Sequence, residues 1–72
     1  MNWTADDIWT YLNVKLTDES GRQIIYRQEG NCFVVWHWHK DSRKIGKDRP
    51  IVTCQNAAYL IEWLTRMGYE YQ

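Results

Sequence analysis

The sequence has little of what marks a secreted or membrane-spanning protein. It contains two cysteines, one proline and four glycines in 72 residues, whereas small disulfide-stapled domains normally carry more cysteines. No run approaches the roughly 18 apolar residues that a membrane-spanning helix needs. The first residues, 1–7, are polar and acidic where a secretory signal would be basic and then apolar. We therefore expect a cytoplasmic protein with Cys32 and Cys54 reduced, and no membrane partner.

The chain also lacks an excess of charge of either sign. Nine Lys and Arg residues balance nine Asp and Glu residues, so the formal net charge is zero. Nucleic-acid-binding modules tend to be basic overall, so the net charge does not favour that kind of partner. A neutral surface instead eases association with a protein or with a second copy of the chain, as in a homodimer.

Aromatic residues, by contrast, are abundant. Five Trp, five Tyr and one Phe make up 15% of the chain. A chain of this length buries only about 60% of the surface that its unfolded form exposes, and each aromatic ring can bury about 150–250 Å². The sequence therefore predicts a single domain, residues 1–72, whose small core is filled largely by aromatic rings.

Local signals predict a helix near the start of the chain. Thr4 can act as the N-cap, and Asp7 stands where it would close a capping box. Apolar residues at helical spacing then predict a helix from about Thr4 to Asn13. The following segment, Val14–Leu16, fits either an extension of this helix or a short strand.

A second helix is predicted near the other end. Thr53 or Asn56 would cap it, and Gly68 would end it as a C′ glycine. The face that it buries should carry Ala57, Leu60, Ile61, Leu64 and Met67.

A β-hairpin is predicted between the helices, from the strands Arg22–Gln28 and Cys32–His39 around Glu29-Gly30-Asn31. We prefer a three-residue loop, because it separates the two faces more cleanly than a two-residue loop; a slip of one residue exchanges the faces of one strand. The face expected to form the core carries Ile24, Tyr26, Cys32, Val34, Trp36 and Trp38. The opposite, half-apolar face carries Gln23, Ile25, Arg27, Phe33, Val35, His37 and His39.

The order of the elements predicts the fold class. Pro50 marks where a third strand, Ile51–Thr53, can begin, and Tyr69–Tyr71 is compatible with a small terminal strand. We therefore predict an α+β domain: an N-terminal helix, an antiparallel sheet of three strands, or four with an added short segment, and a C-terminal helix.

Patterns that would carry catalysis or bind a metal are weak. His37 and His39 point to the same side of a strand and are the candidate metal ligands, but their spacing with Cys32 and Cys54 matches no standard zinc module. No positioned nucleophile, oxyanion loop or carboxylate pair stands out. We therefore expect no enzymatic activity, no metal, no cofactor and no small-molecule substrate.

One candidate binding surface lies on the predicted second helix. Tyr59, Trp63 and Arg66 share a face distinct from its apolar stripe, and these residue types are enriched at the energetic centres of interfaces. The half-apolar sheet face would add Ile25, Phe33 and Val35 unless the first helix covers it. The resulting hypothesis is a small non-enzymatic regulator, such as an inhibitor or accessory protein, that docks on another protein or on itself.

The alternative hypothesis is nucleic-acid binding by the segment 40–49. Five basic residues face only Asp41 and Asp48 there, giving a local net charge of +3. Trp38 lies beside the segment and could stack on a base. A charged run of this kind is also typical of a solvated loop. The basic residues are Lys40, Arg43, Lys44, Lys47 and Arg49.

Overall fold

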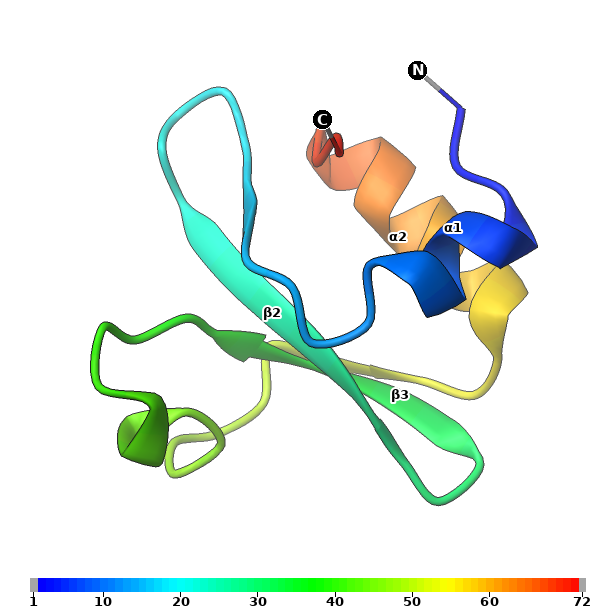
Figure 1. Cartoon of the computed structure of the whole chain (residues 1–72). Coiled ribbons are helices and arrows are strands. Elements are labelled where there is room, and N and C mark those ends of the chain that lie inside the picture. Colours follow the sequence, from blue (N-terminus) through cyan, green and yellow to red (C-terminus); the bar gives the residue numbers. More distant parts are fainter. Residues whose placement is uncertain (1, 72) are drawn as a thin grey trace.

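In the computed structural model, which describes residues 2–71, four strands form an antiparallel sheet in the order in which they occur along the chain, and both helices lie on one side of it (Figure 1). This arrangement confirms the predicted α+β class. The fourth strand is contributed by the segment after the first helix, and the Thr17–Glu70 pairing is an isolated bridge outside the four strands. The elements are α1 Ala5–Thr10, β1 Leu16–Thr17, β2 Gln23–Glu29, β3 Cys32–His37, the 3-10 turn η1 Ser42–Lys44, β4 Val52–Cys54 and α2 Ala57–Met67.

The start of α1 follows the local signals, but its end does not. Thr4 Oγ1 accepts a hydrogen bond from the Asp7 backbone N–H (3.3 Å), and Asp7 Oδ2 accepts one from the Thr4 N–H (2.8 Å), so the predicted capping box is present. The helix ends at Thr10 rather than at the predicted Asn13. Asn13 has a positive φ of 64° and its N–H donates to the carbonyl of Tyr26 (3.0 Å). Pairing with the sheet therefore ends the helix early and leaves the next residues to form β1.

The boundaries of α2 match the prediction, whereas one residue of its buried face does not. Asn56 is the N-cap, its Oδ1 accepting from the Tyr59 N–H at 3.1 Å, and Gly68 ends the helix with a φ of 80°. Leu60 and Leu64 are fully buried, but Met67 is 39% exposed, so its assignment to the buried face is wrong.

The third predicted strand, 51–53, is shifted by one residue to Val52–Cys54. Ile51 donates its N–H to the carbonyl of Val35 (2.8 Å). In the pairing of β3 with β4, however, the residue opposite Val35 is Val52, so Ile51 precedes the strand.

The preferred register of the hairpin is wrong. Glu29 pairs with Cys32, so the turn has two residues, Gly30 and Asn31. Gly30 has a φ of 63°, which suits the first central position of a type II′ turn. Glycine adopts this positive φ without the steric strain that a Cβ would cause. The one-residue difference exchanges the faces of β3 relative to β2.

The main core therefore lies between the sheet and the two helices, and the face bearing the tryptophans is not part of it. Trp36 is on the opposite face of the sheet and is only half-buried, as is Trp38. The predicted half-apolar outer face does not exist as an exposed surface, because Ile25, Phe33 and Val35 are all buried. The core residues are Trp3, Ile8, Leu16, Ile24, Tyr26, Phe33, Val35, Cys54, Leu60, Leu64 and Tyr69.

The segment 40–49, rather than the first helix, covers the second face of the sheet (Figure 1). Ile45 from this segment is 7% exposed, and its carbonyl accepts a long hydrogen bond (3.5 Å) from Arg27 on β2. Ile25 and Val34, which share this sheet face with Arg27, are buried as well. Within residues 2–71, no helix has the length and apolar character needed to cross a membrane.

Candidate functional site

A groove of about 350 Å³ lies between β4 and α2. β4 is the last strand of the sheet and pairs with β3 on one side; no other strand of the described chain pairs with its outer side. The second wall is a single face of α2, because residues three, four and seven positions apart lie above one another on a helix. The groove is lined by Val52, Thr53, Cys54, Gln55, Tyr59, Glu62, Trp63 and Arg66.

The structure brings the three residues proposed for protein binding into this groove. Tyr59 is 55% exposed and is among the most exposed large apolar side chains of residues 2–71. Trp63 is half-buried, because its ring stacks on Tyr69 with the centroids 5.8 Å apart and the planes at 13°. Arg66 is exposed in the last turn of α2, where a positive charge also favours the helix dipole.

The groove carries one charge of each sign. Glu62 and Arg66 stand one helical turn apart and both are exposed. Neither forms an ion pair with another residue in the described part of the chain. Sequence reasoning missed Glu62, although its position four residues before Arg66 could have indicated a shared face. It also missed the wall formed by β4, for which the sequence offers no local signal.

Cys54 lines the groove and is 4% exposed. Burial, together with the nearby Cys32, raises the pKa of the Cys54 thiol. Both cysteines are free thiols. A thiol with a raised pKa stays protonated at neutral pH and is a poor nucleophile, so the groove holds no activated sulfur.

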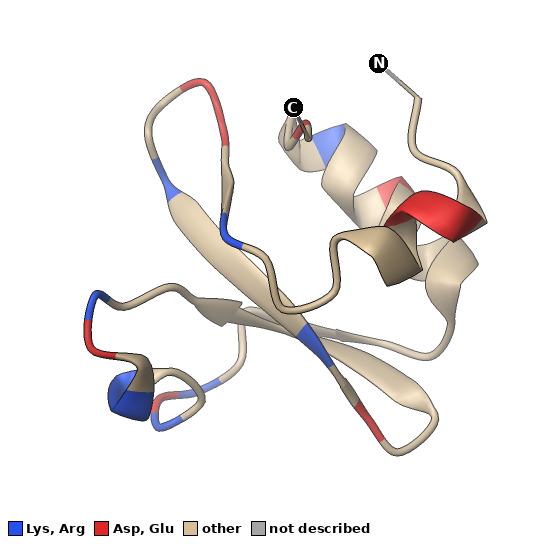
Figure 2. Ribbon diagram, viewed as in Figure 1, with Lys and Arg blue, Asp and Glu red and all other residues tan. Residues whose placement is uncertain are grey.

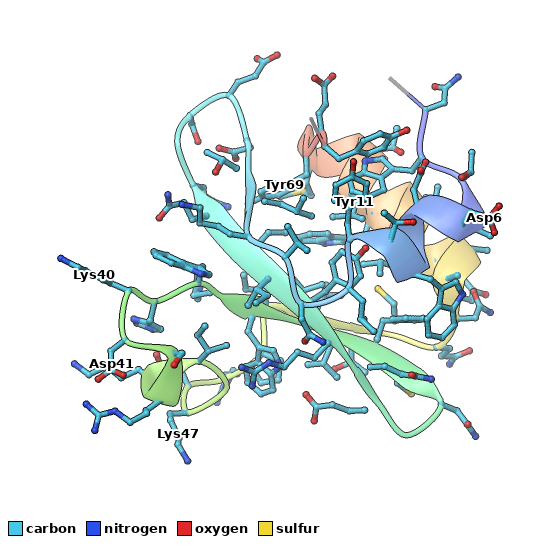
Figure 3. The ribbon with its side chains drawn as sticks, viewed as in Figure 1. Asp6, Tyr11, Lys40, Asp41, Lys47 and Tyr69 are labelled. Carbon is cyan, nitrogen blue, oxygen red and sulfur yellow. The ribbon has the colours of Figure 1, made fainter. Side chains whose placement is uncertain are left out.

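The basic segment 40–49 lies on the other side of the sheet from the helices (Figure 2). Arg43 is paired within the segment, its Nε and Nη2 donating to Asp41 Oδ1 (3.0 Å) and Oδ2 (3.1 Å). These hydrogen bonds lower the pKa of Asp41. Lys40 and Lys47 point away from the body of the molecule (Figure 3), and Lys44 and Arg49 are exposed.

The tryptophans next to this segment already have partners. The Lys15 ammonium lies 4.7 Å from the centroid of the Trp38 ring, a cation–π distance that occupies one face of the indole. Trp36 donates its Nε1–H to Glu29 Oε2 at 3.0 Å. A Cβ at Gly46 would lie 3.8 Å from the Trp36 ring, so the segment packs directly on it. One face of Trp38 and part of the Trp36 ring are therefore already in contact with other parts of the protein.

Among the described residues, His37 and His39 do not belong to a cluster of three potential metal ligands. His39 Nε2 lies 3.5 Å from Asp48 Oδ2, and His37 is exposed. Across residues 2–71, no group of three or more His, Cys, Asp or Glu side chains is arranged to hold a metal ion.

No protein-family model, curated protein or solved structure gives a significant match to this chain.

Proposed function

We propose that this protein is a small, non-enzymatic regulator that docks on a partner protein through the groove between β4 and α2. The observation that carries the proposal is that the open edge of the sheet and the aromatic face of α2 line the same groove. An open strand edge can add an extended segment through main-chain hydrogen bonds, while neighbouring pockets select its side chains. Tyr59, Trp63 and Arg66 supply the residue types that dominate binding energy at such places.

The chemistry of the groove supports binding over catalysis. Its thiol, Cys54, is held protonated, and its one carboxylate, Glu62, is exposed and beside a cation rather than in a water-excluding pocket. A role as an inhibitor or accessory protein needs only the surface. The cytoplasm, where thiols stay reduced, is the compartment that suits a chain with the free thiols Cys32 and Cys54.

A selection of random peptides on the immobilised protein tests the proposal and requires no identified partner. We expect extended, partly apolar peptides to be enriched, and to shift the backbone amide NMR signals of Val52–Cys54 and of α2. Tyr59→Ala should weaken their binding at least about tenfold, a loss of about 1.4 kcal/mol. Met67→Ala is the matched control, because Met67 is exposed on α2 but does not line the groove. Signals that shift only on segment 40–49 would contradict the proposal.

The second candidate function is nucleic-acid binding, which we propose as the alternative because segment 40–49 gathers several exposed basic residues. They are Lys40, Lys44, Lys47 and Arg49. A tryptophan-fluorescence titration with mixed DNA and RNA at low and high salt separates the two. Saturable quenching that weakens with salt, and that is reduced by the double change Lys44→Ala and Lys47→Ala, would favour nucleic acid. A flat response at low salt would favour the groove.

A further inference from the structure

We infer that the partner of the groove is a second copy of this chain, with β4 of one copy pairing antiparallel to β4 of the other across a two-fold axis. This inference rests on the proposed docking function and narrows it to one occupant. It joins two four-stranded sheets into one continuous sheet and lays the two copies of α2 side by side over the junction.

The charges of the groove are the main reason. Glu62 and Arg66 have opposite signs and no ion-pair partner among residues 2–71. An acidic partner would satisfy Arg66 but repel Glu62, and a basic partner would do the reverse. In a two-fold dimer residue i of one copy meets residue j of the other, and j meets i. Antiparallel copies of α2 therefore satisfy both charges, with Glu62 of each copy facing Arg66 of the other.

The β4 edge also suits pairing with itself. A two-fold axis midway between the two copies of Thr53 places Thr53 opposite Thr53. It also places Val52 of one copy opposite Cys54 of the other. Threonine pairs across neighbouring strands are favourable. The strand contains none of the lysines or prolines with which proteins commonly block an open edge, and Pro50 lies outside it. The zero net charge of the chain adds no long-range repulsion between copies.

The expected dimer is reversible. β4 has three residues, so the strands contribute few hydrogen bonds, and the aromatic face of α2 must supply most of the buried area. A stable interface covers about 800 Å² on each partner, and smaller ones give weaker, transient complexes. Among the groove residues, Tyr59 is the exposed large hydrophobic side chain, with 55% of its surface accessible for burial by a second copy.

Sedimentation equilibrium of the full chain over a range of concentrations tests the inference through charge reversal. The wild-type chain should show a monomer–dimer equilibrium. Glu62→Arg and Arg66→Glu should each weaken dimerisation at least about tenfold, because each places like charges opposite one another. The two single variants mixed together should associate, and the double variant Glu62→Arg with Arg66→Glu should dimerise as the wild type does. Glu19→Arg, an exposed change in the turn between β1 and β2, is the matched control and should leave dimerisation unchanged.

The outcomes are distinct. Loss in both single variants with recovery in the mixture and in the double variant supports the inference. A wild-type chain that stays monomeric at the highest concentration overturns it, as does dimerisation that neither single variant affects. The proposed docking function survives that result if the peptide selection still locates ligands at β4 and α2, and it fails separately if the selection does not.

Discussion

Trp3 Nε1 donates a hydrogen bond of 2.8 Å to the backbone carbonyl of Tyr69, a buried contact between residues 66 positions apart. The Trp3 ring also packs edge-on against Tyr71 and Tyr11, with centroids 4.7 Å and 5.9 Å away. These contacts join the segment before α1 to the segment after α2. They therefore hold both helices on the same face of the sheet, which keeps α2 in place as one wall of the groove.

Replacing Trp3 with Phe should destabilise the protein more than the same change at an exposed tryptophan. Trp3→Phe removes the indole N–H and leaves the buried Tyr69 carbonyl unpaired, at a cost of about 1–3 kcal/mol. Trp9 is 51% exposed, so Trp9→Phe should change the free energy of unfolding by no more than about 0.5 kcal/mol. Urea unfolding followed by circular dichroism measures both, and equal losses would contradict the role given to the Trp3–Tyr69 bond.

The two buried tyrosines should respond oppositely to loss of their hydroxyls. Tyr26 donates its hydroxyl to the carbonyl of Ile8 at 2.7 Å, whereas the Tyr69 hydroxyl is buried with no hydrogen-bond partner among the described atoms. Tyr26→Phe should therefore lower the free energy of unfolding by about 1–2 kcal/mol, and Tyr69→Phe should leave it unchanged or raise it. The same urea experiment compares them, and a large loss at Tyr69 would reveal a partner for its hydroxyl.

Stability should fall at alkaline pH, in part through Tyr26. Burial, with a smaller contribution from the Asp7 carboxylate, raises the pKa of Tyr26 above its usual value of 10.0. Above that pH the unfolded chain releases this proton and the folded chain retains it, so the stabilisation present at lower pH is lost as the pH rises. The slope for one such group is at most about 1.4 kcal/mol per pH unit. Urea midpoints at about pH 8 and about pH 10.5 should differ less for Tyr26→Phe than for the wild type, and equal differences would count against this assignment.

The covered outer face of the sheet gives another prediction. Ile45 is the buried apolar residue of the charged segment 40–49, and Ile45→Ala should cost about 2 kcal/mol or more. The loosened segment should also be cleaved faster by trypsin at its lysines and arginines, measured under native conditions by mass spectrometry. Val14→Ala, at a 41% exposed apolar position outside the segment, should change neither the free energy of unfolding nor the rate of cleavage. If trypsin cleaves the segment as fast in the wild type as in Ile45→Ala, the segment is not packed on the sheet.

The parts of the fold that depend on neighbours in sequence could be predicted. The capping box of Thr4 and Asp7, the Asn56 cap and the Gly68 end each depend on contacts within one helical turn. The hairpin itself also follows from Gly30-Asn31 between two β-like runs. These signals are local, so one sequence contains all the information that they need.

The hairpin register could not be read in the same way. On β3, Phe33 and Val35 alternate with Val34 and Trp36, so both faces are apolar and the pattern does not choose between them. The choice depends on the turn and on what covers each face. The single isoleucine, Ile45, within an otherwise polar segment was the signal that both faces are covered.

The candidate site was half predicted. Tyr59, Trp63 and Arg66 could be placed on one helix face because α2 has a clear period. The opposing wall, β4, lies at the groove only because of how the sheet packs against α2. That relationship is tertiary, and no spacing in the sequence contains it.

The different environments of Tyr59 and Trp63 lead to the last prediction, which separates binding from stability within the groove. Trp63 stacks on buried Tyr69, so Trp63→Ala should lower the free energy of unfolding by about 1–3 kcal/mol as well as weaken binding. Tyr59 is more than half exposed, so Tyr59→Ala should weaken binding of the selected peptides or of the second copy while changing stability by less than about 0.5 kcal/mol. Urea unfolding and sedimentation on the same preparations give both quantities. If Tyr59→Ala unfolds the protein as readily as Trp63→Ala does, Tyr59 serves the fold; if it alters neither quantity, the groove is not the docking surface.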